Sequence, residues 1–487
     1  MMPNADINVQ PDHAAGNAGA PARRGWLMFM LFVITTFNFV DRIVFLTLGQ
    51  PIKQDLGLTD LQLGILGGVS FAIFYSFVGF PIARLAERTS RVRLIAASVA
   101  LWSLMTTLCG ATGSMIQLLM CRIGGSIGEA GVQPAAMSLV ADHYPPSRRG
   151  GALTVISLGM PLGLIIGSTA GGWMAQALNW RMAFFIVGAP GVVLAIVSWM
   201  TLREPVRGQF DPPQTREATN EPPSVMQVLK LMTSRSSCRN FMVALGLTSI
   251  GAQGIGAFMF PYFVRVLQLS LAEAGLMFGT IGGIAMGFGM MFGGFGVDWI
   301  SRRDGRWYGW VPAIGLAFAA PLYLVAFATQ GVVVALVALT LGGMFVFMHF
   351  GPTIAVLQNM VGSRMRATAA FLFFFISNLV GMGIGPVSIG FFSDLLARRA
   401  FASGNYIAMC PGGHAPAGSA SGLAQACQHA SAVGLQQAMA GCACFLILGM
   451  LFYLRATRSV RRDLAQGELP QVGDLPAGAL RPASVHK

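Results

Sequence analysis

Charged side chains are scarce in this chain. Asp, Glu, Lys and Arg make up 10% of its 487 residues, whereas soluble proteins carry about 25%. Hydrophobic residues make up 54%, and the mean hydropathy is +0.63. This composition excludes a soluble globular protein and predicts a multi-pass membrane protein.

Several chemical signatures are also missing. No nucleotide-binding loop is present, so ATP-driven pumping by this chain is not expected. The seven cysteines show no metal-ligand spacing, and no nucleophile–base set indicates an intramembrane enzyme. We therefore expect no enzyme activity, no metal and no cofactor. A channel would need a continuous polar lining, and the apolar runs do not supply one.

The N-terminal segment 1–24 lacks the apolar core of a signal peptide. It is polar and contains Pro, Asn and Ala, a composition that favours a disordered tail. We expect a second tail at 456–487.

Long apolar runs dominate the rest of the chain. Twelve reach the length of a membrane span: 26–49, 61–83, 93–113, 115–141, 151–177, 181–202, 239–266, 271–297, 307–329, 331–360, 367–397 and 433–454. The polar stretch 203–238 separates the sixth from the seventh. The sequence thus predicts an all-α protein of twelve transmembrane helices in two six-helix bundles, 25–202 and 239–455, joined by a linker.

The net charge of +13 would be compatible with nucleic-acid binding, but the positions of the basic residues along the chain argue against that role. Most Lys and Arg lie in the two tails and in the even-numbered connections. That asymmetry predicts cytoplasmic termini by the positive-inside rule, with no nucleic-acid partner.

The two halves of the chain also share residue spacings at equivalent positions. Pro134 precedes Arg148 by 14 residues, and Pro352 precedes Arg366 by the same distance. An acid stands four residues before an Arg after the second and the eighth run. A duplicated six-span unit is typical of a transporter whose substrate site lies between the halves near mid-membrane.

Four charges lie inside spans of the N-terminal half: Asp41, Arg42, Arg122 and Glu129. Each costs a few kcal/mol in lipid, so they must face protein or water. Arg122 and Glu129 are seven residues apart and share one helix face. The C-terminal half has no evident mid-membrane carboxylate.

These charges suggest a coupling mechanism. A buried carboxylate that exchanges its Arg partner during a conformational change can take up and release a proton. We assign proton coupling to Asp41 and Glu129, and charge pairing or binding of a substrate head group to Arg42 and Arg122. A static network that only orients helices is the alternative.

Further candidates lie elsewhere. Glu87, Arg88, Arg91, Asp298 and Arg302 are placed to latch helix ends in a cytoplasmic gate, or only to set topology. A second set, Phe258, Tyr262 and His349, offers candidates for a substrate cavity, although core packing is the commoner role of such residues.

The connection 398–432 is long and rich in small residues. Topology puts it outside the membrane, where a disulfide between Cys410 and Cys427 could survive. The sequence leaves that pairing open. His414 and His429 are expected to be solvated rather than metal-bound.

The turn Ala83-Arg84-Leu85-Ala86-Glu87-Arg88-Thr89-Ser90-Arg91-Val92 resembles the G-x-L-A-D-R-x-G-R-K signature of the major facilitator superfamily. It departs from that signature at Ala83, Glu87, Ser90 and Val92, which puts the tightness of its packing in doubt. The stretch Arg122 to Ala130 resembles the R-x-x-x-G-x-G-E-A pattern, with Ser126 in place of the first Gly.

Within that superfamily the chain is most similar to the spinster family. The motifs are Phe37 to Arg42, Leu56 to Gly64, Arg122 to Glu129, and Gly383 to Pro386 leading to Ser393-Asp394. The resemblance implies proton-linked transport of lysophospholipids or sphingoid phosphates, with Asp41 and Glu129 in proton coupling.

The function expected is therefore proton-coupled transport of an amphipathic lipid-like substrate by alternating access. A carrier of small organic anions or a drug exporter is the alternative. We expect a monomer in the bacterial inner membrane, surrounded by membrane lipids.

Overall fold

The computed structural model describes residues 21–144, 146–205, 225–329, 331–361, 365–402, 404–416 and 418–468. Most of the two predicted tails and most of the linker lie outside these ranges. Helices and short turns make up the described chain, which contains no strand. The all-helical prediction is confirmed.

The N-terminal half holds six long helical segments. The helices are α1 (Pro21–Asp55), α2 (Asp60–Gly64), α3 (Ser70–Arg88), α4 (Arg91–Cys109), α5 (Met115–His143), α6 (Pro146–Ser157), α7 (Gly159–Ala177) and α8 (Trp180–Thr201). The π-helical turn η2 (Ile65–Val69) joins α2 to α3. The pairs α1–α7, α3–α5, α4–α5 and α4–α8 pack against each other.

The C-terminal half repeats this plan. Its helices are α9 (Val225–Ser234), α10 (Ser236–Arg265), α11 (Leu271–Ser301), α12 (Trp307–Ala328), α13 (Val332–Phe347), α14 (Phe350–Asn359), α15 (Arg366–Ile376), α16 (Gly383–Ala400), α17 (Tyr406–Met409), α18 (Ser421–Ala456) and α19 (Val460–Glu468). The turns η5 (Ser377–Met382) and η6 (Pro411–Gly413) complete it. Helix α9 lies inside the predicted linker, and α19 lies inside the predicted C-terminal tail.

Eleven segments of the described chain are long and apolar enough to cross a membrane. They match eleven of the twelve predicted runs. The remaining run, the fourth (115–141), corresponds to α5, whose 29 residues give a length of about 43 Å. It carries two charged residues, Arg122 and Glu129, inside the span.

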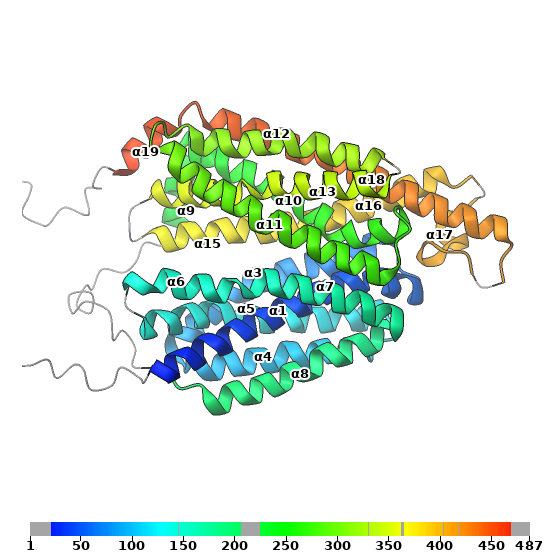
Figure 1. The fold of residues 1–487 in the computed structure, drawn as a ribbon, viewed down its shortest axis with the longest axis horizontal. Coiled ribbons are helices and arrows are strands. Elements are labelled where there is room, and N and C mark those ends of the chain that lie inside the picture. Colours follow the sequence, from blue (N-terminus) through cyan, green and yellow to red (C-terminus); the bar gives the residue numbers. More distant parts are fainter. Residues whose placement is uncertain are drawn as a thin grey trace, which may run out of the picture.

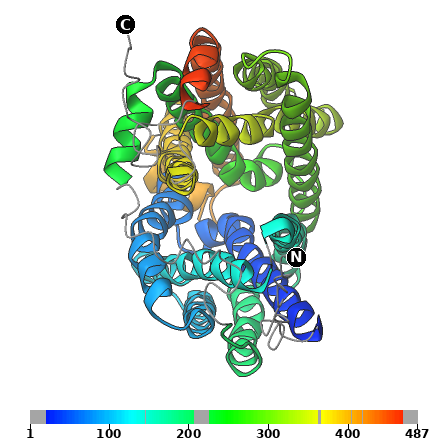
Figure 2. The ribbon, with the colours of Figure 1, turned by 90° about the vertical axis from the view of Figure 1, so that its left-hand side faces the viewer.

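The two halves form two groups of helices, blue to teal and green to red in Figure 1, and the view from one end in Figure 2 separates them in the same way. At one end of the long axis α8 ends and α9 begins. We call it the linker end. The opposite end carries α17, η6 and a disulfide, and we call it the disulfide end.

Contacts between the halves run along α7 and α11 and gather towards the disulfide end, where α2 and η2 pack on α16. Glycine makes this approach possible. A Cβ atom at Gly64 would lie 2.5 Å from the carbonyl oxygen of Pro386, and one at Gly68 would lie 2.6 Å from that of Met382. Larger residues there would push the helices apart.

Candidate functional site

Four charged side chains meet inside the N-terminal half, two from α1 and two from α5. Asp41, Arg122 and Glu129 are 4%, 5% and 2% exposed. The Nε atom of Arg42 lies 3.8 Å from Oε2 of Glu129, and Arg122 lies near both carboxylates. The two charge pairs predicted as neighbours are therefore brought together into one central cluster.

Aromatic rings hold the two guanidinium groups of this cluster. The Cζ atom of Arg42 lies 4.1 Å from the ring centroid of Phe71, and that of Arg122 lies 4.2 Å from the ring of Phe45. Such cation–π contacts stabilise an arginine in a region that holds little water. They also leave N–H donors free to bind an anion.

The hydrogen-bonding capacity of the central cluster is only partly used. Both carboxylate oxygens of Glu129 and the Nε atoms of Arg42 and Arg122 are buried without a hydrogen-bond partner among the described residues. Buried polar groups in proteins are nearly always bonded, so exceptions point to function. Here the carboxylate can take up a proton, and the guanidinium groups can donate hydrogen bonds to an anionic group.

Close packing of α4 on α5 fixes the position of Glu129. A Cβ atom at Gly128 would lie 2.8 Å from the backbone nitrogen of Trp102 and 2.9 Å from the carbonyl oxygen of Ser98. The glycine therefore lets α4 approach, and the adjacent Glu129 is buried on the central side of α5.

The three cavity candidates take different positions. Phe258 lines a small apolar pocket between the halves, together with Phe45, Leu63 and Pro386. Tyr262 is fully buried in the C-terminal core, where its hydroxyl donates to the carbonyl of Ala326 at 2.8 Å. His349 is 4% exposed, and its Nδ1 atom lies 2.6 Å from the carbonyl oxygen of Val346.

A second charged cluster, which sequence reasoning missed, joins the halves at the disulfide end. Lys53 of α1 donates to Asp60 at 2.7 Å, and Arg265 of α10 donates to both oxygens of that carboxylate at 2.8 Å. The Oγ atom of Ser393 donates to it at 2.7 Å. All four residues are buried. We call this set, with Asp394, the inter-half cluster.

Asp394 binds the first turn of α2 across the same boundary. Its two carboxylate oxygens accept hydrogen bonds from the backbone amides of Asp60 and Leu61, at 3.0 and 2.8 Å. Unpaired amides at a helix N-terminus favour an anion. The capping-box residues Thr59 and Gln62 marked this terminus in the sequence. Asp394 stood out only as part of the Ser393-Asp394 motif, and no local pattern paired it with a terminus more than 300 residues away.

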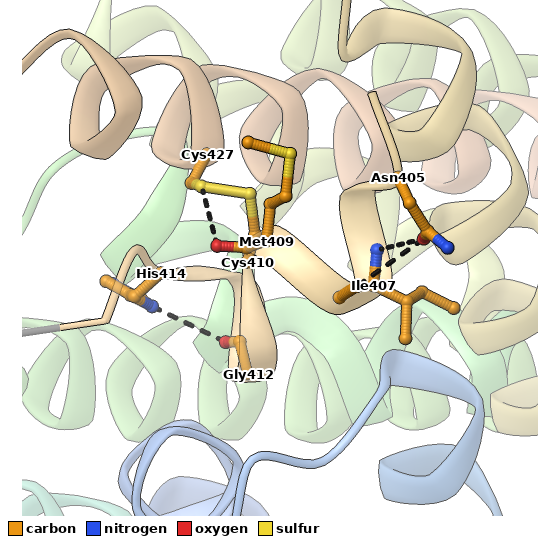
Figure 3. Close-up of a disulfide and its surroundings, with 8 residues drawn as sticks. Asn405, Ile407, Met409, Cys410, Gly412, His414 and Cys427 are labelled. Atoms are coloured by element: carbon orange, nitrogen blue, oxygen red, sulfur yellow. Dashed lines mark hydrogen bonds between the residues drawn. A yellow bond between two sulfur atoms is a disulfide. The ribbon is translucent and has the colours of Figure 1, made fainter. Parts of the chain in front are cut away.

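A loop of the C-terminal half crosses to α1 beside this cluster. The disulfide Cys410–Cys427 fixes the loop to α18, and residues 410–414 form what we call the strap (Figure 3). A Cβ atom at Gly412 would lie 2.8 Å from the carbonyl oxygen of Lys53, and Nε2 of His414 lies 3.1 Å from Nε2 of Gln54.

His414 is half-buried in this position rather than solvated as expected. Its burial, followed by the nearby charges of Arg265 and Lys53, lowers the pKa of the imidazole. The neutral form is therefore favoured, which suits a contact beside two cations.

The three predicted gate residues whose side chains the structure describes, Arg88, Arg91 and Arg302, do not bridge the halves. Arg91 pairs with Asp142 of α5 and, at 2.6 Å, with Glu204, which follows α8 at the start of the predicted linker. Arg88 and Arg302 are exposed. The side chains of Glu87 and Asp298 lie outside the described residues, so their role in a gate stays a prediction.

The Arg91 contacts also affect Glu204. Partial burial opposes ionisation of this carboxyl, but hydrogen bonds from Arg91, the Val92 amide and Ser90 outweigh it and hold the pKa of Glu204 below its usual value.

Within the described ranges no group of three or more His, Cys, Asp or Glu side chains could hold a metal ion.

Comparisons with known proteins agree with this architecture. An MFS-type efflux pump of Mycolicibacterium smegmatis is 32% identical over 396 residues, which cover 80% of this chain and 88% of the relative. The cis,cis-muconate transport protein of Acinetobacter baylyi is 26% identical over 353 residues, covering 71% and 82%.

A solved structure is similar over nearly the whole chain. It is a bacterial homologue of the human lysosomal transporter Spinster, in an inward-facing and unoccupied conformation, with a TM-score of 0.81 and 31% identity. The match covers 91% of this chain and 99% of that one. The spinster resemblance seen in the sequence is confirmed, and the chain is a multi-pass membrane transporter rather than an enzyme.

One family model spans most of the described helices, from α1 into α16. It is that of the Major Facilitator Superfamily, and it matches residues 30–386. The chain belongs to this superfamily.

Proposed function

We propose that this transporter moves an amphipathic anion with a hydrocarbon tail, such as a lysophospholipid or sphingoid phosphate, in exchange for or together with protons. The observation that carries the proposal is the central cluster. It combines a buried carboxylate without hydrogen bonds, Glu129, with two ring-held arginines, Arg42 and Arg122.

In the proposed cycle Arg42 has two alternative partners. Without substrate it lies near Glu129. An anionic head group offers paired acceptors that fit a guanidinium better than a carboxylate at 3.8 Å does. Once Arg42 binds the head group, Glu129 loses its counter-charge in a buried site, and protonation then removes the cost of the isolated charge.

The apolar part of the substrate has a matching surface. Phe45, Phe258 and Leu63 line the small pocket between the halves, and Phe45 also contacts Arg122. A substrate with its head group at the arginines could therefore extend its tail towards apolar side chains of both halves. This arrangement supports a lipid-like anion over a small organic acid.

Alternating access requires the inter-half cluster to open and re-form. In this structure its buried ion pairs close the disulfide end, which we assign to the outside of the bacterial inner membrane. The linker end, where α1 begins and α19 ends (Figure 1), is then cytoplasmic. The excess of Arg and Lys in the connections at that end supports this orientation.

A carrier of small organic anions is the second candidate, because the muconate transport protein is a relative of this chain. Reconstitution in liposomes with an imposed pH gradient separates the two. Labelled lysophospholipid, a sphingoid phosphate and a dicarboxylate would be offered in parallel. Gradient-dependent uptake of the lipids alone would support the proposal, and uptake of the dicarboxylate alone would overturn it.

A further inference from the structure

An exposed group of arginines occupies the linker end of the C-terminal half. Three lie in the connection between α11 and α12, two at the end of α18 and two on α19. All seven are exposed: Arg302, Arg303, Arg306, Arg455, Arg458, Arg461 and Arg462. We call this set the arginine patch.

Packing brings these three segments together, as the neighbouring left ends of α12 and α19 in Figure 1 also show. A Cβ atom at Gly309 would lie 3.1 Å from the carbonyl oxygen of Tyr453, and one at Gly305 would lie 3.3 Å from Leu464. Nε of Arg461 lies 3.7 Å from Asp304. The patch is therefore one surface built from distant parts of the chain.

One acid of α19, Asp463, is buried beneath this surface. Asp463 is 2% exposed and accepts hydrogen bonds from the hydroxyl and the amide of Ser237, at 2.6 and 3.0 Å. These bonds anchor α19 on α10 and turn its arginines outward. Among the described acids, Asp304, with its side chain 34% exposed, lies near Arg461, and Asp463 lies 3.5 Å from Nε of Arg462, so two acids offset only part of the charge of the seven arginines.

Exposed aromatic side chains lie directly beside the arginines. Phe295 and Trp299 near the end of α11 are 75% and 66% exposed, and Trp310 in the first turn of α12 is 42% exposed. Arg303 lies 5.5 Å from the ring of Trp299. Exposed tryptophans at the ends of spans mark the level of lipid head groups, so the patch lies at that level too.

We propose that the arginine patch binds the head groups of anionic phospholipids, such as phosphatidylglycerol or cardiolipin, in the leaflet at the linker end. Clustered arginines next to a span attract acidic lipids, and the planar guanidinium bonds phosphate through paired donors. The adjacent aromatic side chains contact the acyl chains. The site is separate from the transport path and does not depend on the transported substrate.

The competing explanation is that these arginines only set topology. In that case any exposed arginines would contribute equally to lipid retention. A matched comparison of two quadruple variants of the full chain separates the two explanations. One is R303Q/R306Q/R461Q/R462Q. The control, R93Q/R239Q/R398Q/R399Q, removes the same charge from exposed positions outside the patch.

Each protein would be reconstituted in bilayers of phosphatidylethanolamine and phosphatidylglycerol, extracted gently and analysed by native mass spectrometry for bound lipid. We expect the patch variant to retain about fivefold less phosphatidylglycerol than the wild type, with phosphatidylethanolamine unchanged. The control should retain wild-type amounts. Equal retention by the patch variant and the wild type, or an equal loss in the control, would overturn the proposal.

A lysine variant, R303K/R306K/R461K/R462K, changes the same four positions but keeps their charge. It therefore separates loss of charge from loss of local structure. We expect it to retain at least half of the bound phosphatidylglycerol. If it loses as much as the glutamine variant while its unfolding temperature stays at the wild-type value, head-group attraction is not the cause and the proposal fails.

Discussion

Arg42 and Glu129 face each other at 3.8 Å between Nε and Oε2, and neither atom has a hydrogen-bond partner among the described residues. The distance is too long for a hydrogen bond. The pair is held by charge and by the rings around Arg42 rather than by directed bonds. A small movement of α1 relative to α5 is therefore enough to separate the two groups.

Glu129→Gln removes the carboxylate that we assign to proton coupling, while keeping its shape. We expect uptake driven by a pH gradient to fall at least about tenfold, whereas exchange of labelled for unlabelled substrate without a gradient continues. Transport in liposomes measures both. The control is Asp55→Asn, which removes an exposed carboxylate paired with Arg181 at the disulfide end. Gradient-driven uptake at the wild-type rate would exclude Glu129 from coupling.

Arg42→Ala tests the head-group role. Loss of a charge-assisted bond of about 1.5–3 kcal/mol should weaken binding of an anionic lysolipid about tenfold or more, and binding of a zwitterionic one by much less. Competition binding to the purified protein gives both affinities. An equal loss for the two lipids would instead assign Arg42 a structural role.

Asp60→Asn removes the negative centre of the inter-half cluster and leaves Lys53 and Arg265 buried without it. Breaking a buried pair on one side costs about 3–5 kcal/mol, so we expect the disulfide end to open more often. Hydrogen exchange should rise in residues 56–66 and 404–416. Exchange there that matches the wild type would show that the cluster does not hold the halves together.

Glu204→Gln tests the contact with Arg91 through its pH dependence. The pKa of Glu204 is depressed below its ordinary value of 4.5, so its ionised form stabilises the fold above that pH. This stabilisation is lost as the pH falls through the depressed pKa. We expect the variant to unfold at a lower temperature than the wild type at pH 7.

The same argument predicts that the difference in unfolding temperature between Glu204→Gln and the wild type becomes smaller as the pH falls below about 4. Thermal unfolding in detergent across this range measures it, with Asp55→Asn as the control for an exposed carboxylate. A difference that stays constant with pH would show that the ionised Glu204 contributes nothing.

The sequence indicated the helical architecture and the central cluster because both depend on local signals. Apolar runs have the length of a span, and a charge inside such a run stands out against it. Asp41 and Glu129 were found on that ground alone. Their proximity to each other was predicted because charges in a membrane must face one another or water.

The inter-half cluster left no such signal. Lys53, Asp60 and Arg265 stand at the ends of runs, where charges are ordinary, and only the fold brings them within 2.8 Å. The half-buried position of His414 could not be predicted from the sequence for the same reason. A loop rich in small residues looks solvated until the helix that it covers is known, and that helix belongs to the other half.

The strap has a consequence for tools that report on the transport cycle. Its disulfide ties it to α18 alone, so the strap travels with the C-terminal half, while the end of α1 beneath it belongs to the N-terminal half. Together they form a composite epitope that exists only while the disulfide end is closed. An antibody fragment that contacts both Gln54 and His414 would recognise that one conformation, and its binding would arrest the transporter there.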